Sequence, residues 1–218
     1  GSEMCIRDRH IRDEGIYSLE KGRTFYTSNA GLKQLREEIA HYLRRRYQVS
    51  YDPLHEIMIT VGGSEAIDIA LRAMVNPGDE VLIPQPSYVS YEPCAVLAGA
   101  KPVIIPLKAE NEFRLTAQEL LDAITEKTKI LILPYPNNPT GALYPKEVLQ
   151  QIVDLAREHQ LIIFSDEIYD RLVMDGLEHV SIASLAPDLF CVTFSGLSKS
   201  HMIAGFRIGW MILSGNKA

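Results

Sequence analysis

Hydrophobic positions recur along the chain with two different periods, and the period changes repeatedly between residues 30 and 213. Leu32, Leu35, Ile39 and Leu43 follow one another at steps of three or four with charged residues between them, which predicts an amphipathic helix over residues 30–48. Short apolar runs bounded by turn residues predict strands instead. These strands are expected at residues 57–61, 80–84, 102–107, 129–134, 161–165, 190–194 and 208–213.

Further helices are predicted between these strands, at residues 64–75, 87–98, 116–124 and 145–159. The third opens on a capping-box spacing and the fourth carries a proline at its first turn. Strands that alternate with helices predict an α/β fold of three layers, α/β/α, with a mostly parallel sheet covered on both faces. In such folds the ligand lies beyond the carboxyl ends of the strands.

The composition is that of a globular protein, with 46% apolar and 23% charged residues, and 218 residues suffice for one large domain. A formal charge of −6 argues against binding to nucleic acid, because no face-long excess of Lys or Arg is present to meet phosphates. The one basic run, at residues 44–46, falls in the last turn of a predicted helix, where cations complement the helix dipole. No apolar run approaches the roughly 20 residues that a membrane-spanning helix needs, so no membrane partner is expected.

Three isolated cysteines, Cys5, Cys94 and Cys191, have no CxxC spacing and indicate neither a disulfide framework nor a zinc site. We therefore expect a cytoplasmic protein without a metal. Residues 1–9 are dense in charge and lack the apolar stretch of a signal peptide. We expect residues 1–9 to be a non-native segment left by cloning, and residues 10–218 to form the domain.

Three motifs follow predicted strands. Gly62-Gly63-Ser64 ends a strand and opens a helix, so free N–H groups and the helix dipole converge there on an anion, although such a glycine pair is often only a tight turn. Tyr88 presents an aromatic ring after the next strand, where core packing would also explain it. Residues 137–141, Asn-Asn-Pro-Thr-Gly, are strong turn formers by composition.

Two charged residues stand beside apolar strands. Asp166 follows the strand at 161–165, where an acid must find a partner or raise its pKa, and a helix N-cap would also satisfy it. Lys199 has small and apolar neighbours, so burial or the cation of Arg207 would lower its pKa and leave a neutral amine that can form a Schiff base. The alternative is that Lys199 caps a loop and Arg207 is a surface charge.

In chain order, the glycine turn, the aromatic residue, Asn-Pro-Thr-Gly, Asp-x-x-Tyr and Ser-Lys followed by Gly-Phe-Arg resemble the motifs of the class I/II aminotransferases, the fold-type I enzymes of pyridoxal 5′-phosphate (PLP). The resemblance covers about residues 26–209, and residues 161–214 look most like bacterial alanine-type and aspartate-type aminotransferases. Two residues depart from the pattern. Gly196 stands where many members have a phosphate-binding Ser or Thr, and Met202 is bulkier than the usual residue.

The resemblance implies that Lys199 forms a Schiff base with PLP and then moves a proton as general base and acid. Asp166 would keep the pyridine nitrogen protonated, while Tyr169 and Asn138 would donate to the phenolic oxygen. Tyr88 would stack on the ring. The phosphate would be held by Gly63, Ser64, Ser198 and Arg207, and by Tyr26 from the neighbouring subunit of a homodimer.

The implied function is a PLP-dependent aminotransferase that moves an amino group between an amino acid and a 2-oxo acid. The resemblance also implies that the chain is a fragment, a large cofactor-binding domain without the N-terminal arm before Tyr26 and without the small domain that binds the substrate carboxylate. Two alternatives stay open. One is another fold-type I PLP enzyme, such as a β-lyase or a synthase, and the other is a PLP-binding domain without catalysis.

Overall fold

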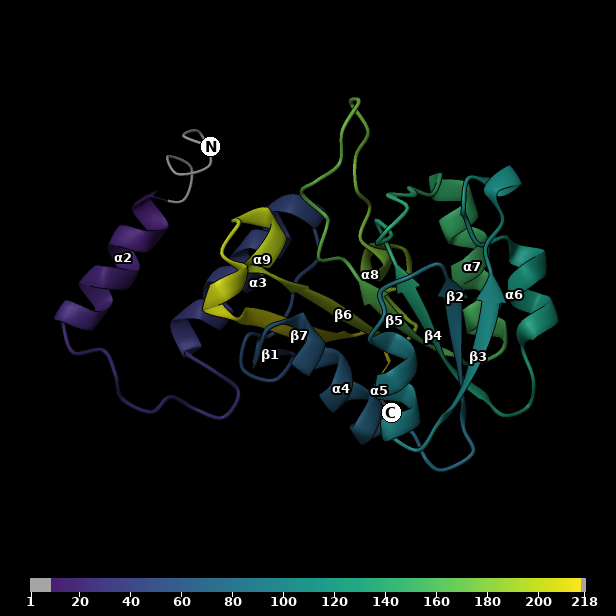
Figure 1. Ribbon diagram of the computed structural model, residues 1–218, viewed down its shortest axis with the longest axis horizontal. Coiled ribbons are helices and arrows are strands. Elements are labelled where there is room, and N and C mark those ends of the chain that lie inside the picture. The colour runs from purple at the N-terminus through teal and green to yellow at the C-terminus, as the bar shows by residue number, and fades with distance from the viewer. Residues whose placement is uncertain (1–8, 217–218) are drawn as a thin grey trace.

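A computed structural model describes residues 9–216, and within them seven strands form one sheet (Figure 1). The strand order is β1-β7-β6-β5-β4-β2-β3, and β7 runs antiparallel to both of its neighbours while the other pairs are parallel. The mostly parallel sheet predicted above is therefore confirmed. The strands are β1 (Ile57–Val61), β2 (Glu80–Gln85), β3 (Lys101–Pro106), β4 (Thr128–Pro134), β5 (Ile162–Asp166), β6 (Cys191–Gly196) and β7 (Ile208–Ser214).

Helices cover both faces of this sheet, as a three-layer fold requires (Figure 1). α4 and α5 lie on one face, α6, α7 and α8 lie on the other, and α3 packs beside β1 and β7. Single-turn helices and 3₁₀ turns complete the chain. The helices are α2 (Arg9–Glu20), α3 (Lys33–Tyr47), α4 (Gly63–Met74), α5 (Tyr91–Leu97), α6 (Ala117–Ala123), α7 (Lys146–Glu158), α8 (Ile182–Leu185) and α9 (Leu197–Ser200), with 3₁₀ turns η1 (Ala109–Asn111) and η2 (Ala204–Phe206).

The central strands are buried on both faces because each supplies two separate cores. In β4, Ile130 and Ile132 pack on the side of α4 and α5, whereas Leu131 and Leu133 pack on the side of α7. Side chains of a strand point alternately to opposite faces, so an unbroken apolar run is what a strand between two helical layers needs. This explains why such runs, and not alternating patterns, marked these strands in the sequence.

The capping box predicted for α6 is present. The hydroxyl of Thr116 accepts from the backbone N–H of Glu119 at 3.2 Å, and the Glu119 carboxylate accepts from the backbone N–H of Thr116 at 3.0 Å. The basic run of residues 44–46 also lies in the last turn of α3, as expected. Both features stabilise helix ends, by about 0.5–2 kcal/mol for the cap and less for the exposed cations.

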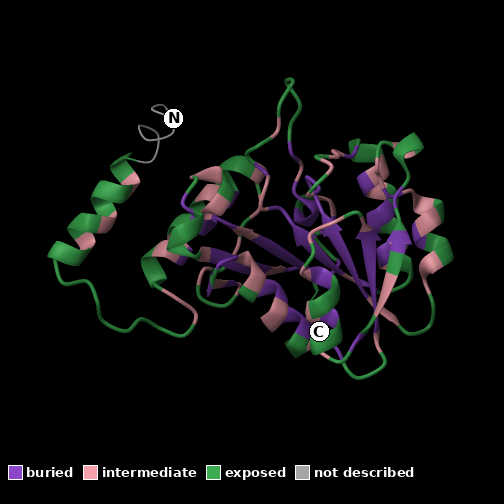
Figure 2. Cartoon of the chain, viewed as in Figure 1, coloured by how far each residue is buried: buried purple, intermediate pink, exposed green. Residues whose placement is uncertain are grey.

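The structure differs from the sequence expectation in several helices, of which two matter most. α5 begins only at Tyr91, because residues 87–90 form the turn that carries Tyr88, so the helix expected from residue 87 is too long by one turn. Residues 9–20 form α2, to which no element had been assigned. α2 has no buried residue and lies apart from the sheet, as its green and pink colouring in Figure 2 shows. Between residues 9 and 216, no helix has the length and apolar character to cross a membrane.

Candidate active site

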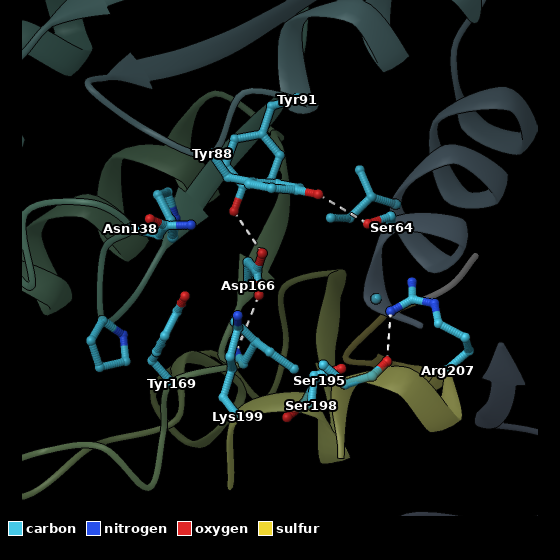
Figure 3. Close-up of a pocket in the computed structure, with 16 residues that line it drawn as sticks. Ser64, Tyr88, Tyr91, Asn138, Asp166, Tyr169, Ser195, Ser198, Lys199 and Arg207 are labelled. Atoms are coloured by element: carbon cyan, nitrogen blue, oxygen red, sulfur yellow. Dashed lines mark hydrogen bonds between the residues drawn. The ribbon is translucent and has the colours of Figure 1, made fainter. Parts of the chain in front are cut away.

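A pocket with a volume of about 160 Å³ opens at the edge of the sheet where β1, β2, β4, β5 and β6 end and β7 begins (Figure 3). Its lining comes from the loops and helix starts that follow these strands, which is where a parallel sheet is expected to bind its ligand. Nine of the ten residues proposed from the sequence line it. They are Gly63, Ser64, Tyr88, Asn138, Asp166, Tyr169, Ser198, Lys199 and Arg207.

One end of the pocket is built to receive an anion. α4 begins at Gly63, and its N-cap Gly62 offers no side chain to the first-turn N–H groups, so they remain available to a ligand. Ser64 Oγ lies 3.2 Å from the hydroxyl of Tyr88. The guanidinium of Arg207 donates to the carbonyls of Ala204 and Val61 at 3.1 and 3.4 Å. Because a guanidinium has five N–H donors, these two bonds hold the group in place and leave others to meet an anion.

Glycines let three backbone segments meet behind this end of the pocket. Gly62 has a φ of 80°, and a side chain there would overlap the guanidinium of Arg207. A Cβ on Gly209 would overlap the backbone of Gly62. A Cβ on Gly196 would lie 2.7 Å from the carbonyl oxygen of Ile208, so a Ser or Thr does not fit at this position. The departure from the family pattern at Gly196 is therefore a packing requirement between β6 and β7.

Asp166 lies at the other end of the pocket and is buried, with 8% of its surface exposed. Tyr91 donates its hydroxyl to Oδ2 of Asp166 at 2.6 Å, and the backbone N–H of Ile168 donates to Oδ1 at 3.2 Å. Burial raises the pKa of the Asp166 carboxyl above its ordinary value, and these two hydrogen bonds oppose the rise. The sequence prediction that this acid must find a partner or raise its pKa holds in both respects.

Sequence reasoning missed Tyr91. Its ring is 1% exposed and meets the ring of Tyr88 edge to face, with centroids 5.6 Å apart. Burial and the charge of Asp166 raise the pKa of Tyr91 well above its ordinary value, so this hydroxyl keeps its proton and acts as a donor. The signal was available in the chain, since Tyr91 is a second tyrosine three residues after Tyr88 and stands at the start of α5. Ser195, at the end of β6, is a second lining residue that the sequence did not single out.

Lys199 occupies a different environment from the one predicted. It is an exposed residue on the single-turn helix α9, and its ammonium lies 5.6 Å from the ring centroid of Tyr169. The expectation of a desolvated lysine is wrong for this chain, because the side chain points into the open pocket rather than into the apolar layers beneath (Figure 3). Its apolar sequence neighbours face elsewhere, as Leu197 does when it packs with the α3 core.

The loop at residues 137–141 is held by its own polar side chains. Asn137 donates through Nδ2 to the carbonyl of Pro86 and to the hydroxyl of Thr140, each at 3.0 Å. Asn137 is buried, whereas the neighbouring Asn138 lines the pocket. Asn138 and Tyr169 also line a shallower pocket nearby, so the β4 and β5 loops that carry them adjoin each other.

Tyr26 is the one proposed residue that this pocket does not include. It is fully exposed, in the segment between α2 and α3. Within the described residues the chain by itself therefore brings nine of the ten candidates together, and Tyr26 lies outside this pocket.

The pocket fits PLP in its chemistry. Among the described residues no cation pairs with the buried Asp166, and a positive group such as a protonated pyridine nitrogen would stabilise its anion there. The N-terminus of α4 and Arg207 suit a phosphate, and a Cβ at Gly63 would meet no atom within 4 Å, so open space adjoins that helix start. Lys199 offers an amine to the same cavity.

Comparisons with known proteins agree with this geometry. The model of the family "Aminotransferase class I and II" matches residues 5–216. An aspartate aminotransferase of Pyrococcus abyssi is 44% identical over 205 residues, which cover 93% of this chain and 52% of that protein. The aromatic-amino-acid aminotransferase 2 of Thermococcus litoralis is 44% identical over 204 residues, which cover 93% and 52%.

A solved aromatic aminotransferase from Pyrococcus horikoshii superposes with a TM-score of 0.91 at 42% identity, over 94% of this chain and 55% of the other. The chain thus spans about half the length of the relatives it matches. Its α/β fold, with a mostly parallel sheet, is that of the matched part of this aminotransferase. By sequence and by structure, the chain belongs to the class I and II aminotransferase family.

Proposed function

We propose that this chain carries the cofactor site of a PLP-dependent aminotransferase, which transfers an amino group between an amino acid and a 2-oxo acid. The observation that supports this most directly is the buried carboxylate of Asp166, which pairs with no cation among residues 9–216 and shares one pocket with Lys199 and the start of α4. Residues 10–218 would act as the cofactor-binding domain. The expectation for residues 1–9 lies outside the described residues except at Arg9, where α2 begins.

Each end of the pocket would bind one end of the cofactor. The first-turn N–H groups at Gly63 and Ser64, the hydroxyl of Ser198 and the guanidinium of Arg207 would hold the phosphate, since all of them are hydrogen-bond donors at one end of the cavity. Tyr88 would cover a face of the ring. Asp166 would accept a charge-assisted hydrogen bond from the pyridine nitrogen, which keeps that nitrogen protonated.

PLP, when bound, supplies the electron sink that stabilises negative charge at the amino-acid Cα. The protein contributes position and proton transfer. Lys199 stands on a short helix at the pocket rim, from which its amine would bind PLP covalently and later carry a proton from the substrate Cα. Tyr169 and Asn138, which line the pocket from adjoining loops, would donate hydrogen bonds to the phenolic oxygen of PLP.

Substrates and partners follow from the family rather than from this pocket. The relatives named above act on aspartate or on aromatic amino acids, so their names support an amino-acid donor and a 2-oxo acid acceptor without choosing between them. We further propose a homodimer, in which Tyr26 of each copy reaches the phosphate end of the other copy's pocket. The full exposure of Tyr26 supports this, because no described residue of its own copy covers its hydroxyl.

The test is covalent labelling of the PLP-loaded chain. Reduction with borohydride followed by peptide mapping should place the label on Lys199, and the Lys199→Ala variant should take up none. Lys129→Ala is a suitable control, since Lys129 pairs with Asp79 at the opposite edge of the sheet and its loss should leave labelling unchanged. A label on another lysine with Lys199 unmodified would reject the assignment.

A product assay separates the aminotransferase from the other two functions. With an amino donor and a 2-oxo acid, only transamination yields both a new amino acid and a new 2-oxo acid. A β-lyase or synthase would consume the amino acid without forming that pair, and a PLP-binding domain without catalysis would form neither.

A further inference from the structure

The residues from the end of β5 onward point their side chains to two sides of the turn. Asp166 and Tyr169 line the cofactor pocket, whereas Glu167 and Asp170 are buried away from it. The exposed fraction of the Glu167 side chain is 3%. An acid buried this far is expensive unless its oxygens are hydrogen-bonded, so the bonds it makes indicate what it holds together.

Glu167 accepts four hydrogen bonds. Its Oε1 accepts from the hydroxyls of Ser165 and Ser181 at 2.9 and 3.1 Å and from the backbone N–H of Ile182 at 3.0 Å. Its Oε2 lies 2.9 Å from Nε2 of His179. Ile182 is the first residue of α8, so one carboxylate joins the end of β5 to the start of α8. The chain between these two points, residues 168–181, contains Tyr169 and is closed at its base by this single side chain.

His179 extends the connection to a second loop. Its ring stacks on Tyr135 with centroids 4.8 Å apart and a tilt of 32°, and it meets the ring of Tyr47 from α3 edge to face at 5.5 Å. The backbone N–H of Tyr135 donates to the carbonyl of Asp166 at 2.9 Å. Tyr135 immediately follows β4 and precedes Asn138 by three residues. The pair of Glu167 and His179 therefore lies between the loop of Tyr169 and the loop of Asn138.

The far side of the turn is held separately. Asp170 accepts from the hydroxyls of Tyr42 and Tyr47 at 2.8 and 2.6 Å, and its backbone carbonyl accepts from Arg46 at 3.2 Å. All three donors belong to α3. Tyr169 thus stands between two anchored acids, one fixed to the sheet and α8 and the other fixed to α3.

We propose that Glu167, through His179, is a positioning residue that fixes Tyr169 and Asn138 relative to each other, so that both can donate to one acceptor atom in the pocket. This rests on the proposed function, in which that acceptor is the phenolic oxygen of PLP. Glu167 itself does not line the pocket. Its effect on the reaction would be indirect, through the separation and orientation of the two donors.

The substitution Glu167→Gln keeps the shape and removes one acceptor. With Glu167 as a carboxylate, which only accepts, Nε2 of His179 is the donor of the pair. Facing an amide N–H group, His179 would have to accept through Nε2 and carry its proton on Nδ1. Nδ1 of His179 is buried and has no hydrogen-bond partner among the described residues. The variant would therefore bury an unsatisfied donor and loosen the base of the loop.

The first measurement uses the chain without PLP and does not depend on the proposed function. Hydrogen exchange should become about tenfold or more faster in residues 168–182 of Glu167→Gln, since the loss of a buried charged hydrogen bond is of that size. Glu119→Gln is the matched control, because Glu119 also serves as a carboxylate cap, on α6 and far from the pocket. It should speed exchange around α6 alone. If residues 168–182 of Glu167→Gln are as protected from exchange as in the wild type, Glu167 does not hold this loop and the positioning role is wrong.

The second measurement uses the PLP-loaded chain and follows the absorbance of the bound cofactor against pH. Hydrogen-bond donors to the phenolic oxygen lower the pH at the midpoint of the absorbance change. Glu167→Gln should therefore raise this midpoint by about one pH unit, which is a tenfold change in proton affinity. Glu119→Gln should leave the midpoint unchanged. His179→Phe keeps a ring against Tyr135 and should give a shift in the same direction, which provides a second variant if Glu167→Gln does not fold.

The two possible failures are distinguishable. If the wild-type chain takes up no PLP, the proposed function is contradicted. The hydrogen-exchange experiment still shows whether Glu167 holds residues 168–182 in place. Chain that binds PLP with a midpoint unchanged in both variants overturns the positioning role while the proposed function stands.

Discussion

The pocket edge of the sheet and the segment ahead of α3 contrast sharply, although both contain residues of the proposed site. At the pocket edge nine candidate residues from six separate stretches of chain converge on one cavity. Residues 9–29, by comparison, contain no buried residue (Figure 2), and Tyr26 there is fully exposed. The first region brings its candidate residues together within a single chain and the second does not.

The difference has a structural origin. Strand pairing fixes where β1, β2, β4, β5 and β6 end, and each candidate at that edge lies within a few residues of a strand end. Tyr26 precedes every strand, so no strand pairing fixes its position. Site residues at strand ends should therefore respond to substitution within one copy of the chain, whereas the effect of Tyr26 should depend on a second copy.

The largest effect is expected at the centre of the pocket edge, in Asp166→Asn. An amide still fits the site and still bonds to the pyridine nitrogen, but it cannot stabilise that nitrogen in its protonated form as a carboxylate does. PLP should remain bound while turnover falls by about 10³-fold, the scale of losing one electrostatic contact to the reacting charge. Turnover is measured in a full-length aminotransferase that carries this segment.

Asp188→Asn is the control for this experiment, because Asp188 forms an exposed ion pair with Arg157 and lies outside the pocket. Its turnover should match that of the wild type. Near-normal turnover in Asp166→Asn would exclude the proposed electrostatic role of Asp166.

A smaller effect is expected from Tyr91→Phe, measured as the stability of the PLP-free chain against pH. The hydroxyl of Tyr91 lowers the pKa of Asp166, so its loss should let burial raise that pKa further. A carboxyl with a raised pKa holds its proton in the folded state after the unfolded chain has released it. The resulting advantage for the folded state is present at low pH and is lost as pH rises through the folded pKa.

Tyr91→Phe should therefore destabilise the chain by about 1.5–3 kcal/mol at pH 8 and by clearly less at pH 5. Thermal unfolding at both pH values measures this. Tyr144→Phe serves as control, since the Tyr144 hydroxyl is buried and accepts from the backbone N–H of Leu115 rather than meeting an acid. Its loss of stability should be the same at both pH values. An equal loss at both pH values in Tyr91→Phe would show that the bond to Asp166 does not govern the titration.

Most of this pocket could be predicted from the sequence, because its residues lie directly after strands and the strands can be located from local pattern. The position of Tyr26 is not tied to a strand in this way. Apolar runs located the strands, and motifs directly after them were bound to meet at one sheet edge once the sheet was parallel. Side-chain orientation was harder. Lys199 follows an apolar strand, yet it is exposed, because a single turn of helix after β6 directs it into the pocket.

Partners that come from another part of the chain were also beyond local pattern. The bond from Tyr91 to Asp166 joins residues 75 positions apart, and that from Tyr47 to Asp170 joins residues 123 apart. No periodicity marks such pairs, since they arise only when helices are placed on the sheet. Glu167 and Asp170 adjoin Asp166 and Tyr169 in the sequence. The sequence alone therefore could not show that these two acids anchor the turn and do not line the pocket.

The smallest effect in the isolated chain is expected at Tyr26, and it sharpens the contrast between the two regions. Because this side chain is fully exposed, Tyr26→Phe should change the free energy of unfolding by less than about 0.5 kcal/mol. Its hydroxyl should matter only where a second copy is present, so a dimer of the variant should bind PLP about tenfold more weakly than the wild-type dimer, the size of one hydrogen bond to a charged group. Mixing Tyr26→Phe with Lys199→Ala provides the decisive comparison. In a mixed dimer the pocket that keeps Lys199 would receive its tyrosine from the Lys199→Ala copy, so part of the tight PLP binding should return, and borohydride should then label Lys199 at the low PLP concentration where Tyr26→Phe alone is not labelled. If mixing restores nothing while sedimentation shows that mixed dimers form, Tyr26 does not reach across the interface.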